Sequence, residues 1–117
     1  MKQLVFVYGT LRPGERYHYM LTESEYLGRH RTHPRYTMLD LGAFPGIIDG
    51  GCTAIVGDVF AVDPRTLTRL DEFEDYPREY ARDRIATAYG EAWIYLYRPR
   101  PARARVITSG DWCNRGS

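Results

Sequence analysis

One acidic residue of this chain lies on the apolar face of a predicted helix. On a helix of 3.6 residues per turn over residues 64–75, Leu67, Leu70 and Phe73 form an apolar stripe. Glu74 follows Leu70 by four residues and therefore projects from the same stripe. Burying an ionised carboxylate without a partner is costly, so such a group is usually paired or functional. A carboxylate at the end of a cavity can act as a general acid and base, which makes Glu74 a candidate catalytic residue.

A structural role is the alternative for Glu74, because the residue stands near the expected end of the helix. There its carboxylate could reach water or pair with Arg78, Arg82 or Arg84. The sequence leaves both interpretations open. A structure separates them, since a catalytic carboxylate must face a cavity and an ion pair would fill that space.

The second candidate feature is a turn directly after the first predicted strand. An apolar run ends at Tyr8, and the residues Tyr8-Gly9-Thr10-Leu11 form the turn. Gly9 allows conformations that a side chain would forbid, and successive N–H groups in such a turn can bind an anion. These donors suit a substrate carboxylate or a developing oxyanion. The alternative is a simple strand-ending turn, and the phosphate-binding patterns GxxxxGK[ST] and GxGxxG do not occur.

Other reactive residue types are present without a supporting pattern. His18, His30 and His33 lack the cysteine or carboxylate spacing of a metal site. Cys52 and Cys113 belong to no CxxC motif, and no particular histidine is placed to activate Cys52. We therefore expect no metal, no cofactor and two reduced thiols.

Length and composition fit a single domain over residues 1–117. Hydrophobic residues make up 44% of the chain, which is typical of a globular protein. A net charge of +1 argues against nucleic acid or an anionic membrane surface as a partner. No apolar run reaches the roughly 20 residues that span a bilayer, and the N-terminal run is too short for a signal peptide. We expect a cytoplasmic protein with a small-molecule partner, and the sequence does not indicate its oligomeric state.

The elements that position the two features are mostly short strands. Asp63 is a suitable N-cap for a helix from Pro64 to Glu74 or Asp75, and Pro77 should end that helix. A second, short helix is expected within residues 15–26. Strands are expected over residues 3–8, 26–31, 36–41, 54–62, 79–88 and 91–97, the last two as a hairpin.

This order of elements predicts an α+β fold. A twisted mixed sheet that curls towards a small β-barrel, with two or so flanking helices, uses many strands in few residues. Gly57 interrupts its strand and indicates a bulge or a close backbone approach. Residues 98–105 are rich in proline and arginine and are expected to be irregular.

Several segments together resemble the γ-glutamylcyclotransferase-like family, most closely its short bacterial members and the γ-glutamylamine cyclotransferases. The segments that carry the resemblance are Val5–Gly14, Phe44–Gly46, Gly57–Phe60, Leu70–Glu74, Glu79–Arg82 and Trp93–Tyr97. Each motif is short, but their joint order and spacing are specific, and they cover most of the chain.

The resemblance implies a small β-barrel with flanking helices and a cofactor-independent enzyme. Its activity would convert a γ-glutamyl amine or γ-glutamyl amino acid to 5-oxoproline and a free amine. Glu74 would be the catalytic carboxylate, the backbone N–H groups of the turn Tyr8, Gly9, Thr10 and Leu11 would hold the glutamyl group, and Tyr80 would line the same cavity. The alternative is a non-catalytic protein that binds a small carboxylate on the same fold.

Overall fold

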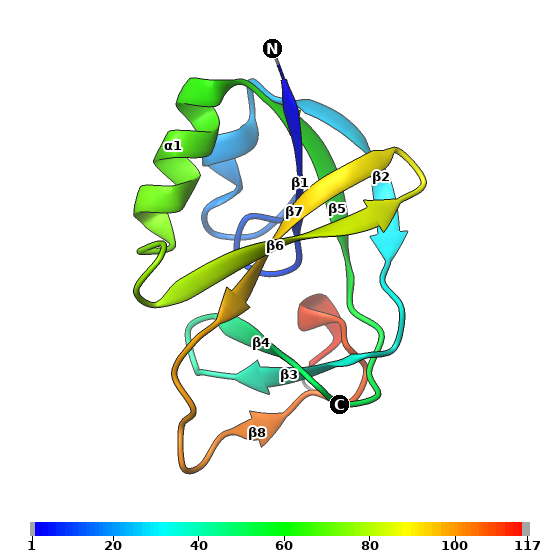
Figure 1. Ribbon diagram of the computed structural model, residues 1–117, viewed down its shortest axis with the longest axis vertical. Coiled ribbons are helices and arrows are strands. Elements are labelled where there is room, and N and C mark those ends of the chain that lie inside the picture. Colours follow the sequence, from blue (N-terminus) through cyan, green and yellow to red (C-terminus); the bar gives the residue numbers. More distant parts are fainter. Residues whose placement is uncertain (1, 116–117) are drawn as a thin grey trace.

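The computed structural model describes residues 2–115, which form two β-sheets and a single α-helix (Figure 1). The larger sheet has the strand order β2-β5-β1-β7-β6, and the smaller sheet, which lies below it in Figure 1, has the order β4-β3-β8. The strands are β1 (Gln3–Val7), β2 (Glu25–Arg31), β3 (Tyr36–Asp40), β4 (Pro45–Asp49), β5 (Val56–Val62), β6 (Tyr80–Thr87), β7 (Gly90–Tyr97) and β8 (Arg105–Val106). The helix is α1 (Pro64–Phe73), and η1 (His18–Leu21) and η2 (Trp112–Asn114) are short 3-10 turns.

β1 lies at the centre of the larger sheet, antiparallel to β5 and parallel to β7. Val5 and Val7 belong to the core cluster that includes Leu70 of α1. Phe6 belongs to the cluster on the other face, with Met38 of β3. Because both faces of β1 are covered, its sequence is continuously apolar rather than alternating. The strand that leads into the candidate turn is therefore held on two sides.

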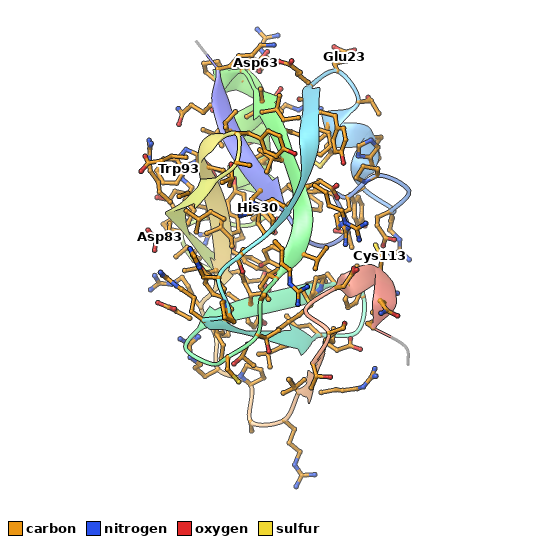
Figure 2. The ribbon with its side chains drawn as sticks, turned by 90° about the vertical axis from the view of Figure 1, so that its right-hand side faces the viewer. Glu23, His30, Asp63, Asp83, Trp93 and Cys113 are labelled. Carbon is orange, nitrogen blue, oxygen red and sulfur yellow. The ribbon has the colours of Figure 1, made fainter. Side chains whose placement is uncertain are left out.

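α1 begins at the predicted residue and ends close to the predicted one. The Asp63 side chain accepts a hydrogen bond of 2.8 Å from the Thr66 N–H and caps the N-terminus, at the top of Figure 2. The last helical residue is Phe73, and Glu74 is the C-cap. Asp75 then adopts a φ of 54°, a left-handed conformation that Asp tolerates and that stops the helix before the expected proline.

The α+β class, the twisted mixed sheet and the hairpin of β6 and β7 are confirmed. The larger sheet does not close into a barrel, because β2 and β6 remain its two edges in the described part of the chain. In place of the helix expected within residues 15–26, residues 18–24 form η1 and turns, because the N–H groups of this stretch bond carbonyls three positions earlier rather than four. β8 adds one short ladder to β3 at the end of the segment that was expected to be irregular.

Gly57 marks a close backbone approach, as its position in the sequence indicated. A Cβ atom at this position would collide with the carbonyl oxygen of Val7 and the ring of Phe6. β5 can therefore pass close to the end of β1 only with glycine there. Within residues 2–115, no helix is both long enough and apolar enough to cross a membrane.

Candidate active site

A cavity of about 230 Å³ opens where the loop after β1, the C-terminal end of α1 and the first residues of β4 and β6 meet. In Figure 1 the loop from α1 into β6 lies at the lower end of the helix, beside the larger sheet. The cavity is lined by Phe6, Val7, Tyr8, Gly9, Thr10, Leu11, Tyr17, Phe44, Pro45, Phe73, Glu74, Glu79, Tyr80 and Tyr95. All six site residues predicted from the sequence belong to this lining, which brings the two candidate features into one space.

Glu74 is largely buried and lines the cavity from the end of α1. In the part of the chain that the structure describes, its carboxylate has no ion pair and no hydrogen bond. Burial raises the pKa of Glu74 to about 8, and the nearby carboxylate of Glu79 contributes to the rise. A carboxyl group of this kind can take up and release a proton near neutral pH.

The three arginines that could have neutralised Glu74 are each paired with another acid. The pairs are Arg78 with Asp75 at 2.7 Å, Arg82 with Asp71 at 2.7 Å and Arg84 with Glu91 at 3.3 Å. Among residues 2–115, therefore, no ion pair fills the space beside Glu74 as the structural alternative would require.

The loop after β1 uses its carbonyl groups to hold its own shape. The Gly9 carbonyl accepts from the Arg12 N–H at 3.1 Å, and the Thr10 carbonyl accepts from the Tyr17 N–H at 2.8 Å. His18 Nδ1 lies 3.0 Å from the Leu11 carbonyl. By contrast, the N–H groups of Gly9, Thr10 and Leu11 have no protein acceptor among residues 2–115. These three residues line the cavity, so their N–H groups are candidate donors to a ligand.

Gly9 is required for a reason that differs from the expected one. Its φ is not in the left-handed region, so the turn does not depend on conformational freedom at this position. Instead, a Cβ atom on Gly9 would lie 2.7 Å from Cγ of Pro45. Only glycine allows the loop to pack this closely against the first residue of β4.

A buried ion-pair network holds the end of the same loop. Arg12 is only 6% exposed, and its Nε and Nη1 atoms donate to Asp58 at 2.8 Å and to Asp111 at 2.7 Å. The Tyr26 hydroxyl donates to the other oxygen of Asp58 at 2.9 Å. The sequence analysis did not identify this network. The signal was Asp58, an acid inside an apolar strand that needs a buried cationic partner.

Three tyrosines of the cavity donate their hydroxyl protons to protein acceptors. Tyr80 donates to the Pro45 carbonyl at 2.9 Å, Tyr8 to the Tyr95 carbonyl at 2.7 Å, and Tyr95 to a carboxylate oxygen of Asp71 at 2.7 Å. Burial raises the pKa of all three hydroxyls, so they stay protonated. Tyr95 is a cavity residue that the sequence analysis missed, although its strand was predicted.

The other reactive residues lie outside the cavity lining. The ring of His30 contacts Phe6 edge-on, with centroids 5.6 Å apart. Cys52 and Cys113 are exposed, and Cys113 lies on the C-terminal turn η2 (Figure 2). The described residues contain no group of three or more histidines, cysteines or acids that could hold a metal ion.

Comparisons with known proteins agree on one family. Residues 5–114 match the family described as gamma-glutamyl cyclotransferase, AIG2-like. A Vibrio cholerae relative that carries the provisional name of a gamma-glutamylcyclotransferase is 50% identical over 115 residues, which are 98% of this chain and 99% of that protein.

Solved structures agree with the sequence matches. The solution structure of the Escherichia coli protein ytfP has a TM-score of 0.75 and 34% identity, and the match covers 98% of this chain and all of the other. An uncharacterized protein of Pyrococcus horikoshii has a TM-score of 0.82 and 28% identity, with 94% of this chain and 89% of the other covered. The chain therefore belongs to the gamma-glutamyl cyclotransferase, AIG2-like family.

Proposed function

We propose that the protein is a cofactor-independent cyclotransferase that converts a γ-glutamyl amine or γ-glutamyl amino acid to 5-oxoproline and a free amine. One observation carries the proposal. An unpaired and largely buried carboxylate, Glu74, lines the same cavity as three backbone N–H groups that have no acceptor among the described residues. Family membership supports the same reaction class.

The two features match two needs of a γ-glutamyl substrate. In the proposed complex, the backbone N–H groups of Gly9, Thr10 and Leu11 hold the glutamyl group, and at least one of them faces the γ-carbonyl oxygen and stabilises the oxyanion that forms there. The α-ammonium lies beside Glu74. A pKa of about 8 makes Glu74 a stronger base than an ordinary carboxylate, so it can take a proton from the α-ammonium.

The reaction then needs only proton transfers and one ring closure. Glu74 takes a proton from the α-ammonium, and the free amine attacks the γ-carbonyl carbon to give a tetrahedral intermediate. The bond between that carbon and the leaving nitrogen breaks as Glu74 delivers this proton to the nitrogen. The ring nitrogen then gives up a second proton to the ionised Glu74, which passes it to the departing amine. Of the three protons on the α-ammonium, one therefore stays on the lactam nitrogen and two end on the amine, which leaves as an ammonium. Because the attack is intramolecular, the cavity has mainly to fold and orient the substrate.

The test is release of 5-oxoproline from a panel of γ-glutamyl amines and γ-glutamyl dipeptides. Wild type should turn over at least one member of the panel, Glu74→Gln should fold and release none, and Glu72→Gln should behave as wild type because Glu72 is exposed. Retained turnover in folded Glu74→Gln would refute the role of Glu74. Thermal stabilisation by these compounds without any turnover would favour the alternative, a non-catalytic carboxylate-binding protein.

A further inference from the structure

The loop after β1 closes as a turn over residues 9–12. The Arg12 N–H donates to the Gly9 carbonyl at 3.1 Å, so Thr10 and Leu11 are the two central residues of this turn. Both residues line the cavity. The backbone angles of the central residues set the direction of their N–H groups, and the position of Arg12 constrains those angles. Whatever fixes Arg12 therefore fixes the direction of these two candidate donors.

Two acids from distant parts of the chain hold the Arg12 side chain. Nε donates to Asp58 of β5 at 2.8 Å, and Nη1 donates to Asp111 at 2.7 Å. Arg12 and Asp58 are both buried. A planar guanidinium presents its donors in fixed directions, so two simultaneous pairs determine its orientation as well as its charge balance. Asp58 neutralises Arg12 within the larger sheet, and Asp111 adds a second point of attachment.

Asp111 is itself held firmly at the C-terminal turn η2. The Gly110 carbonyl before it accepts from the Val56 N–H of β5 at 2.9 Å, and Trp112 after it is buried in the core. Oδ1 of Asp111 also accepts from the N–H of Cys113, which Figure 2 labels, at 3.0 Å. The carboxylate that meets Arg12 thus belongs to backbone that is fixed on both sides. None of residues 109–114 lines the cavity, so any effect of Asp111 on a bound substrate is indirect.

We propose that Asp111, acting through Arg12, is a positioning residue of the active site that directs the N–H groups of Thr10 and Leu11 towards the reacting carbonyl. This inference rests on the proposed function and adds to it a residue outside the cavity. The oxyanion develops as the reaction proceeds, so a misdirected N–H group lowers kcat more than it weakens substrate binding. A purely structural role for Asp111 would instead lower stability and leave kcat of the folded protein unchanged.

Asp111→Ala is the first test, because it removes one attachment of Arg12 and leaves the other. Asp58 still neutralises the buried guanidinium, so the variant should fold. Loss of a whole oxyanion donor lowers kcat by about 10²–10³, and misdirection of the donors should lower kcat for 5-oxoproline release by at least about tenfold. The fold-change in kcat should also exceed that in KM. A smaller fall in kcat, or one exceeded by the change in KM, would overturn the inference.

Arg115→Ala is the matched control for loosening of the same turn. Arg115 donates to the Trp112 carbonyl at 2.7 Å, and its guanidinium carbon lies 3.8 Å from the centroid of the Trp112 ring. Neither contact involves Arg12 or Asp111. At a temperature where all variants are folded, kcat of Arg115→Ala should stay within about threefold of wild type. An equal loss of kcat in Arg115→Ala and Asp111→Ala would reflect general loosening of the turn and would overturn the inference.

A double-mutant cycle tests whether Asp111 acts through Arg12. The variant Arg12→Met/Asp58→Asn removes the guanidinium together with its buried counter-charge, which avoids an unpaired charge in the sheet. On this background Asp111→Ala should change kcat by less than about threefold, because Arg12 is no longer there to transmit the effect. A larger further loss would show that Asp111 acts by another route and would overturn the inference.

The backbone amide signals of Thr10 and Leu11 in an NMR spectrum of isotope-labelled protein give a readout that needs no turnover. Asp111→Ala should shift both signals, and Arg115→Ala should leave both in place. Unchanged signals in Asp111→Ala would overturn the inference. If wild type releases no 5-oxoproline from any member of the panel of γ-glutamyl compounds, the cyclotransferase assignment is refuted, and these signals then decide whether Asp111 positions the loop.

Discussion

Replacing Glu74 by glutamine should stabilise the folded protein, and the gain should grow with pH. A carboxyl group whose pKa is higher in the folded than in the unfolded state favours folding while it is protonated in both states. That contribution is present below the unfolded pKa and is lost as the pH rises through the folded value. Glutamine resembles the protonated carboxyl group and does not titrate, so the variant should not lose this contribution.

The size of the effect follows from the burial of the carboxylate. The pKa of Glu74 is about 8 in the folded protein, compared with 4.5 for an unperturbed glutamate. At 1.36 kcal/mol per pKa unit, the shift lowers the free energy of unfolding of the wild type, relative to its value at low pH, by about 3 kcal/mol at pH 7 and about 5 kcal/mol above pH 8. These values are a ceiling, because water that enters the cavity screens the charge. We expect a measured gain of about 1 to 3 kcal/mol at pH 8 and almost none at pH 4.5.

The assay is urea unfolding of wild type and Glu74→Gln at several pH values from 4.5 to 9. Because the slope for a small protein is about 1–3 kcal/mol per molar urea, the expected gain moves the midpoint at pH 8 by about 1 M. Glu72→Gln is the matched control and should show no such pH-dependent difference, since Glu72 is exposed. A difference between wild type and Glu74→Gln that does not change with pH, or a variant that is less stable at pH 8, would refute the reasoning.

Three further changes test the surroundings of the carboxylate. Glu79→Gln should lower the pKa of Glu74 by removing a neighbouring negative charge, and so move the rising limb of the kcat/KM profile, near pH 8 in wild type, to lower pH. A rising limb at the same or higher pH would contradict this expectation. Arg12→Leu should lower the free energy of unfolding, measured with urea at pH 7, by about 3–5 kcal/mol, because it leaves Asp58 buried without its partner. A loss below about 1 kcal/mol would mean that the network does not stabilise the fold. Gly9→Ala should raise KM and lower the free energy of unfolding by about 1–3 kcal/mol, because the added methyl group meets the facing proline. Unchanged KM and stability would show that the loop can move away.

Features that depend on local periodicity could be predicted from the sequence. The positions of Leu67, Leu70 and Glu74 on one helical face follow from their spacing, and Asp63 marks the start of the helix by its capping chemistry. The central strand β1 was predicted from its continuous apolar run, because such a run is typical of a strand covered on both faces. In each case the determining interactions lie within a few residues of one another.

Features that depend on distant contacts could not be predicted in the same way. Arg12 and Asp111 are 99 positions apart, and nothing local to either residue shows that they form an ion pair. The role of Gly9 depends on Pro45 of a different sheet, so the sequence indicated the right residue for the wrong reason. Tyr95 reaches the cavity only because β7 pairs in parallel with β1. Sheet order and register, rather than residue type, decide these contacts.

The isolation of Glu74 results from the acids around it. The segment contains several carboxylates and is followed by several arginines, so an ion pair to Glu74 was a reasonable expectation from charge alone. Instead Asp71, three residues before Glu74, holds Arg82 with both oxygens, and Asp75, directly after it, holds Arg78. Glu74 is left at the C-terminal end of α1, where the helix dipole also disfavours a negative charge. The neighbouring acids thus hold the arginines in other pairs, and burial, together with the nearby Glu79, then allows Glu74 to hold a proton near neutral pH.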